Sequence, residues 1–241
     1  MALALPPKSS CTPSDAPTVD RLLDSVIATR PGAITTYQFY EEVDSWLGPW
    51  GAGGYPIGYG KKYNIAFATN PPLNRDLMYG RPWVQKTTVL LQEALKGFLV
   101  RQVSSGAVAT MDEPTLRAAA FDTHPKAYLD AGLLKVAENS PELIAVIMTI
   151  PIAEFSPTSP NFVATWIQVF RVLSMPKIVD LLRAVLGAEA RSAPPAIVIR
   201  FIWEAAASRI PGLPALPPGA RDDNFWDKLG GWGGWVNIFD R

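Results

Sequence analysis

The pattern of apolar and polar positions predicts a mainly α-helical chain. Apolar residues recur every three or four positions, as on one face of a helix, in residues 18–29 and again in residues 36–47. The clearest helix begins near Pro82, because the fixed φ of proline suits a first helical turn, and it carries Leu95 and Leu99 on one apolar stripe. We therefore expect this helix to lie at the centre of the core.

Shorter helices are predicted further along the chain, where a polar residue repeatedly precedes a proline. The places are Asp112 before Pro114, Thr123 and His124 before Pro125, Ser140 before Pro141, Ser159 before Pro160, Ser174 before Pro176, and the pair Pro194 and Pro195. A polar side chain caps the free N–H groups of a helix, and proline fits the turn that follows. On this pattern we interpret His124 as a helix-start residue.

Residues 48–81 have no helical periodicity and are rich in Gly, Tyr and Trp. Long segments of this kind in compact domains are usually functional or contain short strands. We expect a Gly/aromatic loop or a small β-hairpin here, with Tyr55–Phe67 as the strand candidate. The predicted fold class is mainly α, with one globular multi-helix domain and this single irregular region.

The composition divides the chain into three parts. Residues 1–17 combine four prolines with Ser and Thr and predict a flexible N-terminal tail. Residues 18–209 form the expected helical globular domain. Residues 210–241 read as a Pro-rich linker and a Trp/Gly C-terminal tail, in which Trp232 and Trp235 would pack on the domain or on a protein partner.

Charge and hydropathy limit the partners and the location. Hydrophobic residues make up 48% of the 241 residues and charged ones 18%, which is typical of a packed globule. Basic and acidic residues both number 22, so we expect no nucleic-acid binding. The apolar helices within residues 143–203 are too short for a membrane span but do not exclude membrane contact if they open.

The N-terminus has neither the basic region nor the long apolar region of a Sec signal. We expect a protein that is cytoplasmic as synthesised, or one exported by a specialised route that does not use Sec. The high Ala and Pro content is typical of a bacterial protein from a GC-rich genome, although composition is a loose guide.

The single histidine and single cysteine exclude most metal and thiol chemistry. His124 and Cys11 cannot supply the ligands of a zinc site, and no G-x-S-x-G elbow is present for a serine hydrolase. Tyr55 occupies the position that a phosphate-binding loop ending in Gly60 and Lys61 would fill with glycine. We therefore predict no metal and no cofactor.

Carboxylates remain as candidates for acid–base chemistry. Glu41 and Asp44 lie on a helix that runs directly into the Gly/aromatic segment, so we expect Glu41 as a half-buried carboxylate at the edge of a cleft. The aromatic side chains concentrated in this part of the chain suit sugar binding, although they equally suit a core. The candidate substrate-binding residues are Trp50, Tyr55, Tyr59 and Tyr63.

Gly54–Gly60 resembles the glycine-rich hairpin of phage-type lysozymes, in which a helix-terminal Glu precedes the hairpin. The resemblance implies that Glu41 is the general acid of a glycan hydrolase. The positions of the family's Asp and Thr are Trp50 and Pro56 here, so a different second carboxylate is needed, either Asp44 or Asp76. The likeness covers about 20 of the 241 residues.

Three functional hypotheses stay open from the sequence. The first is a lysozyme-like glycan hydrolase, a bacterial effector or toxin domain that acts on glycan or peptidoglycan through Glu41. The second is a non-enzymatic helical protein, either an interaction module or a membrane-active toxin. The third is a small-molecule enzyme with an apolar pocket between helices.

Overall fold

The computed structural model describes residues 4–27, 37–140 and 142–155, and the single residues 159, 161, 165, 168 and 172. These residues are mainly helical and include no strand, which confirms the predicted class. The chain divides into two compact units, Met1–Ile150 and Pro151–Arg241. Among the described residues, no helix combines the length and the apolar character that a membrane crossing needs.

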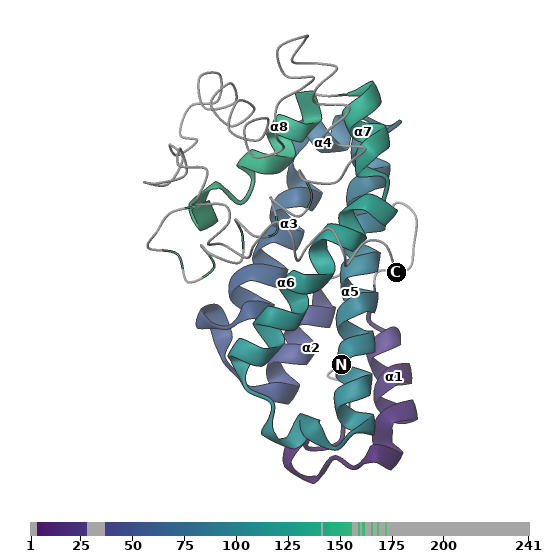
Figure 1. Ribbon diagram of the computed structural model, residues 1–241, viewed down its shortest axis with the longest axis vertical. Helices are drawn as coiled ribbons and strands as arrows, with labels where there is room; N and C mark the ends of the chain where they lie inside the picture. Colours follow the sequence, from purple (N-terminus) through teal and green to yellow (C-terminus); the bar gives the residue numbers. More distant parts are fainter. Residues whose placement is uncertain are drawn as a thin grey trace, which may run out of the picture. The chain divides into compact units, whose positions relative to one another are not determined.

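Eight α-helices of the described residues lie in the first unit (Figure 1). They are α1 (Ala16–Asp24), α2 (Gln38–Leu47), α3 (Lys62–Thr69), α4 (Pro71–Arg75), α5 (Gly80–Ser104), α6 (Glu113–Asp130), α7 (Leu133–Asn139) and α8 (Glu142–Thr149). Short helical turns connect them: η1 (Lys8–Ser10), η2 (Pro13–Asp15), η3 (Gly51–Gly53), the π-helix η4 (Pro56–Lys61) and η5 (Ala107–Thr110), while η6 (Ile152–Phe155) belongs to the second unit.

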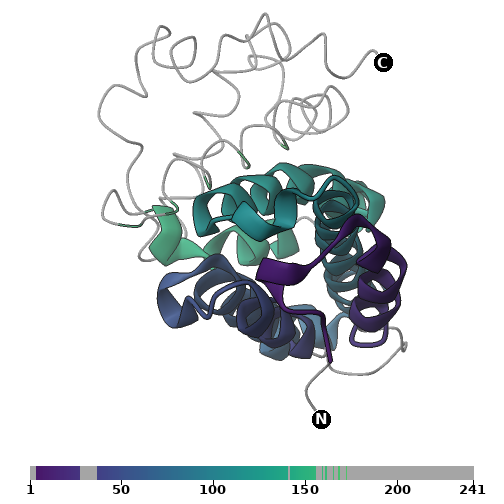
Figure 2. The ribbon, with the colours of Figure 1, turned by 90° about the horizontal axis from the view of Figure 1, so that it is seen from below.

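Helix α5 forms the centre of the first unit, as its apolar stripe predicts. Leu95, Leu99 and Val103 are almost completely buried along it. Figure 1 shows α1 beside one end of α5 and α4 and α7 at the other, with α6 running alongside, and Figure 2 shows the same bundle from below. Lys96 of α5 fixes the α1 contact through ion pairs with Asp20 and Asp24 at 3.1 and 2.6 Å.

The N-terminal segment differs from the flexible tail that its composition predicts. Residues 4–17 form η1, η2 and the start of α1, and Cys11 is buried. Lys8 Nζ donates hydrogen bonds to the carbonyl oxygens of Leu47 and Met111, and Trp46 Nε1 donates to Pro6 O. Two backbone carbonyl groups and one side chain from later in the chain therefore hold this Pro-rich segment in place.

Residues 48–81 contain no strand, so the expected β-hairpin and the strand at Tyr55–Phe67 are wrong. This stretch holds η3, η4, α3 and α4 instead. Its glycines allow close packing: a Cβ at Gly58 would lie 2.2 Å from Ala52 O, and one at Gly60 would lie 2.5 Å from the Tyr40 ring. The glycine-rich run thus resembles a lysozyme hairpin in sequence but forms a tightly packed helix.

Helix α6 confirms the predicted helix start at Asp112, whereas the predicted start at His124 is wrong. Asp112 is the N-cap, and its Oδ1 accepts a hydrogen bond from Thr115 N at 3.0 Å. No helix starts at His124, because α6 continues through Pro125. Proline inside a helix removes one hydrogen bond, and Pro125 lies in a buried part of α6 together with Phe121 and Ala127.

Several predicted features lie outside the described residues. These are most of the apolar helices within residues 156–203 and the whole of the 210–241 tail, including Trp232 and Trp235. The boundaries proposed at residues 209 and 210 stay predictions.

Candidate functional site

The structure places Glu41 at the surface of α2. Its Oε1 accepts a hydrogen bond from Lys61 Nζ at 2.5 Å, and its side chain is 44% exposed. This hydrogen bond raises the pKa of Lys61, and the Lys61 ammonium also lies 4.6 Å from the centre of the Tyr37 ring. Glu41 therefore forms a surface ion pair and does not line the pocket described below.

The other two candidate carboxylates hold turns of the backbone. Asp44 is only 6% exposed, and its two oxygens accept hydrogen bonds from Trp50 N and Gly51 N, each at 3.2 Å. Asp76 accepts from Met78 N, from Tyr79 N and from Ser140 Oγ. These backbone N–H bonds, that of Tyr79 above all, lower the pKa of Asp76.

Three of the four predicted aromatic residues meet at one pocket. Tyr55, Tyr59 and Tyr63 follow each other at intervals of four along η4 and α3, so they share one face. The fourth, Trp50, lies outside the lining. A π-helix such as η4 is rare and frequently occurs at functional sites.

Side chains of α6 fix the start of η4. Glu113 Oε1 accepts a hydrogen bond from Tyr55 N at 2.7 Å, and Arg117 Nη2 donates to Gly53 O at 3.1 Å. Glu113 and Arg117 also pair with each other at 2.7 Å. This arrangement positions Tyr55 against α6.

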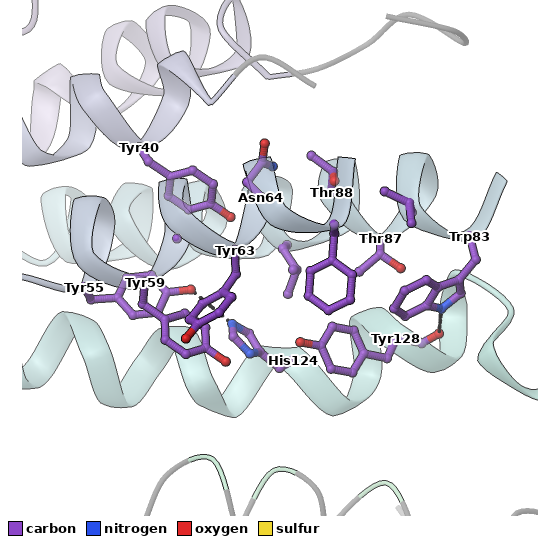
Figure 3. Close-up of a pocket in the computed structure, with 14 residues that line it drawn as sticks. Tyr40, Tyr55, Tyr59, Tyr63, Asn64, Trp83, Thr87, Thr88, His124 and Tyr128 are labelled. Atoms are coloured by element: carbon purple, nitrogen blue, oxygen red, sulfur yellow. Dashed lines mark hydrogen bonds between the residues drawn. The ribbon is translucent and has the colours of Figure 1, made fainter. Parts of the chain in front are cut away.

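The pocket lies between α2, the η4–α3 segment, α5 and α6 and has a volume of about 40 Å³ (Figure 3). It is partly open to solvent. Aromatic rings form most of its wall. The lining residues are Tyr40, Tyr55, Tyr59, Gly60, Tyr63, Asn64, Phe67, Trp83, Val84, Thr87, Thr88, Leu91, His124 and Tyr128.

His124 is the central polar group of this wall and is 1% exposed. Its Nε2 lies 3.0 Å from Tyr55 Oη, and the rings of Phe121 and Tyr128 lie 5.1 and 5.7 Å from the imidazole. Burial raises the pKa of Tyr55 well above its ordinary value, so the phenol keeps its proton. A protonated phenol both donates and accepts, so the tautomer of His124 sets which of the two groups is the donor.

Two other polar residues of the lining each have a side-chain oxygen without a hydrogen-bond partner. Asn64 on α3 is 8% exposed and Thr87 on α5 is 6% exposed. Asn64 Oδ1 and Thr87 Oγ1 are inaccessible to solvent and accept or donate no hydrogen bond. Figure 3 shows Asn64 near Tyr40 and Thr87 near Trp83. Buried polar atoms are nearly always hydrogen-bonded, so two exceptions in one pocket need an explanation.

The electrostatic character of the pocket is neutral. None of its lining residues is Lys, Arg, Asp or Glu. Burial raises the pKa of Tyr40 as well as that of Tyr55, so both phenols stay uncharged. In the part of the chain that the structure describes, no three His, Cys, Asp or Glu side chains form a group that would hold a metal ion.

Sequence reasoning missed His124, Asn64 and Thr87 as members of this site. The four-residue spacing of Tyr55, Tyr59 and Tyr63 was the available signal, because it predicts a helical face and not a strand. Because Pro125 directly follows His124, the pattern predicted a helix start at this position and not a residue of a pocket wall.

No protein-family model, no curated protein and no solved structure matches this chain. The fold and the site therefore define the protein by themselves: a helical bundle with a neutral, aromatic-lined pocket between its helices.

Proposed function

We propose that the protein binds a small organic molecule in the pocket between α2, η4–α3, α5 and α6. The observation that carries this proposal is the partly open cavity of about 40 Å³ with a mostly aromatic, uncharged wall. Concave sites of this composition are where small organic molecules bind in proteins.

The aromatic wall supports the same proposal. Small-molecule pockets are mostly apolar and carry a few polar groups that orient the ligand. Here the rings of Tyr59, Tyr63 and Trp83 provide apolar contact area, and Asn64, Thr87 and His124 are polar residues of the same lining.

Binding is better supported than catalysis. The only histidine is almost fully buried, and its Nε2 is engaged in a hydrogen bond with Tyr55 Oη. No carboxylate lines the pocket to supply a second acid–base group. The arrangement therefore favours recognition of a molecule over proton transfer to or from it.

The sequence-based hypotheses now differ in support. Glycan hydrolysis through Glu41 stays a prediction. The group that pairs with Glu41 is Lys61, a cation, and not the second carboxylate that the reaction needs. The membrane-active and partner-binding hypotheses depend largely on segments outside the described residues. Of the third hypothesis, a small-molecule enzyme with an apolar pocket between helices, the pocket supports the part that concerns binding of a small molecule.

The proposal is tested by fluorine NMR on protein labelled with 5-fluorotryptophan, with a library of small neutral fragments added at millimolar concentration. The chain has eight tryptophans, and the signal of Trp83 is assigned from Trp83→Phe. We expect pocket ligands to shift the Trp83 signal, because Trp83 lies in the lining, and to leave most others unchanged.

The matched variants are Val84→Met and Val100→Met, both on α5. Val84 lines the pocket, and the longer methionine side chain fills part of its volume, whereas Val100 lies outside the lining. Val84→Met should weaken fragment binding and Val100→Met should not. The proposal is rejected when no fragment shifts the Trp83 signal, or when both variants weaken binding equally.

A further inference from the structure

The loop between α4 and α5, residues 76–79, exposes two adjacent apolar side chains at one end of α5 (Figure 1). Leu77 is 65% exposed and Met78 is 74% exposed, more than any other large apolar side chain of the described residues. The next two, Tyr37 and Ile65, are 39% and 36% exposed and lie far apart in the chain. Single exposed apolar residues are normal on a protein surface, whereas apolar side chains exposed together indicate an interaction site.

Hydrogen bonds fix the shape of this α4–α5 loop. Asp76 Oδ1 accepts from Met78 N at 3.0 Å and from Tyr79 N at 2.8 Å. Arg81 N donates to Asp76 O at 2.8 Å and closes the loop. Ser140 Oγ donates to Asp76 Oδ2 at 2.9 Å, which ties the loop to the segment between α7 and α8. The exposed tip therefore belongs to an ordered backbone, which has little conformational entropy left to lose on binding.

The charges around the loop are mostly positive. Residues 63–92 contain three basic residues, Arg75, Arg81 and Lys86, and a single acidic one, Asp76. The Asp76 carboxylate is engaged by the hydrogen bonds within the loop. Arg75 ends α4 and Arg81 lies in the first turn of α5, and neither forms a salt bridge with another described residue. Two cationic side chains thus flank the apolar tip and favour an anionic partner.

We propose that the α4–α5 loop attaches the protein to the surface of an anionic lipid membrane. Leu77 and Met78 enter the boundary between headgroups and acyl chains, and Arg75 and Arg81 lie against the lipid phosphates. A membrane accepts a protruding pair of apolar side chains anywhere on its surface, whereas a stable protein contact needs a far larger area than two side chains supply. None of these four residues lines the pocket, so the inference is independent of the proposed ligand.

The test measures binding of the full chain to lipid vesicles by flotation. One set of vesicles contains phosphatidylglycerol and phosphatidylcholine in equal parts, and the other contains phosphatidylcholine alone. We expect binding to the anionic set and about tenfold weaker binding to the neutral set, because the two arginines act through charge. High salt should weaken binding to the anionic set for the same reason.

Two pairs of variants assign the contact. Met78→Ser should weaken binding to anionic vesicles about tenfold because apolar contact is lost, whereas its control Ile65→Ser, at an exposed residue of α3, should not. Arg75→Gln should weaken binding about fivefold. Its control Arg101→Gln makes the same change near the other end of α5 and should leave binding unchanged. All four residues are exposed, so each variant should fold with an unchanged circular dichroism spectrum.

An environment-sensitive fluorophore at position 78 reports insertion directly. It is attached through Met78→Cys in a Cys11→Ala background, and Ile65→Cys labelled in the same background is the control. Anionic vesicles should shift the emission to shorter wavelength at position 78, because the fluorophore leaves water, and should leave the emission at position 65 unchanged.

The other outcomes overturn the inference. Absence of binding to both vesicle sets excludes attachment to a membrane, and equal binding to both sets contradicts recognition of anionic lipid. Binding that survives Met78→Ser, or an emission shift at position 65 but not at position 78, places the contact elsewhere. A chain that binds no vesicles but forms a dimer that Met78→Ser dissociates would make the loop a contact between two copies.

Discussion

The end of α2 and the aromatic pocket differ in how their polar groups are used. At the end of α2, Asp44 accepts two backbone hydrogen bonds and Glu41 pairs with Lys61. In the pocket, Asn64 Oδ1 and Thr87 Oγ1 are buried and have no partner. The first region is explained by the stability of the local structure. The second leaves two buried oxygens unsatisfied, so the polar groups of the pocket wall are less completely bonded than those at the end of α2.

The largest expected effect is at His124. His124→Ala removes a buried ring and leaves the Tyr55 hydroxyl without the hydrogen-bond partner that Nε2 supplies, so we expect a loss of about 3–5 kcal/mol in the free energy of unfolding. Urea denaturation followed by circular dichroism measures it. A loss below about 1 kcal/mol would mean that His124 does not hold the pocket wall together.

The next effect is a loss of stability at alkaline pH. Burial raises the pKa of Tyr40 and Tyr55 above the ordinary value, so the folded state keeps their protons at a pH where the unfolded chain releases them. Their contribution is complete below about pH 10, the pKa of an unfolded tyrosine, and falls as the pH rises further. Each phenol should contribute about 1.4 kcal/mol per pH unit in that range.

Urea titrations between about pH 9 and pH 11 test this expectation. Tyr55→Phe should reduce the slope of unfolding free energy against pH by the contribution of one phenol. Tyr79→Phe, which changes a tyrosine outside the lining, is its control. An equal slope in Tyr55→Phe and in the unmodified protein would contradict the burial of an ionisable phenol in the pocket wall.

The smallest effects compare the two carboxylates of α2. Asp44→Asn removes one of the oxygens that accept from Trp50 N and Gly51 N and should cost about 1 kcal/mol. Glu41→Gln loses only a surface ion pair and should change stability by less than about 0.5 kcal/mol. Thermal unfolding of the two variants compares them directly, and a larger loss for Glu41→Gln would reverse our interpretation of this region.

Much of the fold was predictable because its signals are local. The apolar stripe of α5, the helix before Gly48 and the Asp112 cap each depend on residues within a few turns of one another. The glycine-rich segment was not predictable in this way. Gly58 and Gly60 are required by the approach of Ala52 and Tyr40, which only the folded chain reveals.

The candidate site was predictable only in part. The sequence identified Tyr55, Tyr59 and Tyr63 as binding residues, and the structure brings them together. It paired them with Glu41 because that residue is close along the chain, whereas the structure pairs them with His124 of α6. That Asn64 and Thr87 lack partners follows from the packing of α3 and α5 and leaves no trace in the sequence.

The central claim is that a molecule binds between α3, α5 and α6, and nuclear Overhauser effects test it most directly. The measurement uses isotope-labelled protein and, at saturating concentration, an unlabelled aromatic fragment that shifts the Trp83 fluorine signal. We predict contacts from the ring protons of this fragment to the methyl group of Thr87 and to the rings of Tyr59 and Tyr63. Contacts confined to exposed side chains such as Leu77 and Met78, or no contacts at all, would contradict the account.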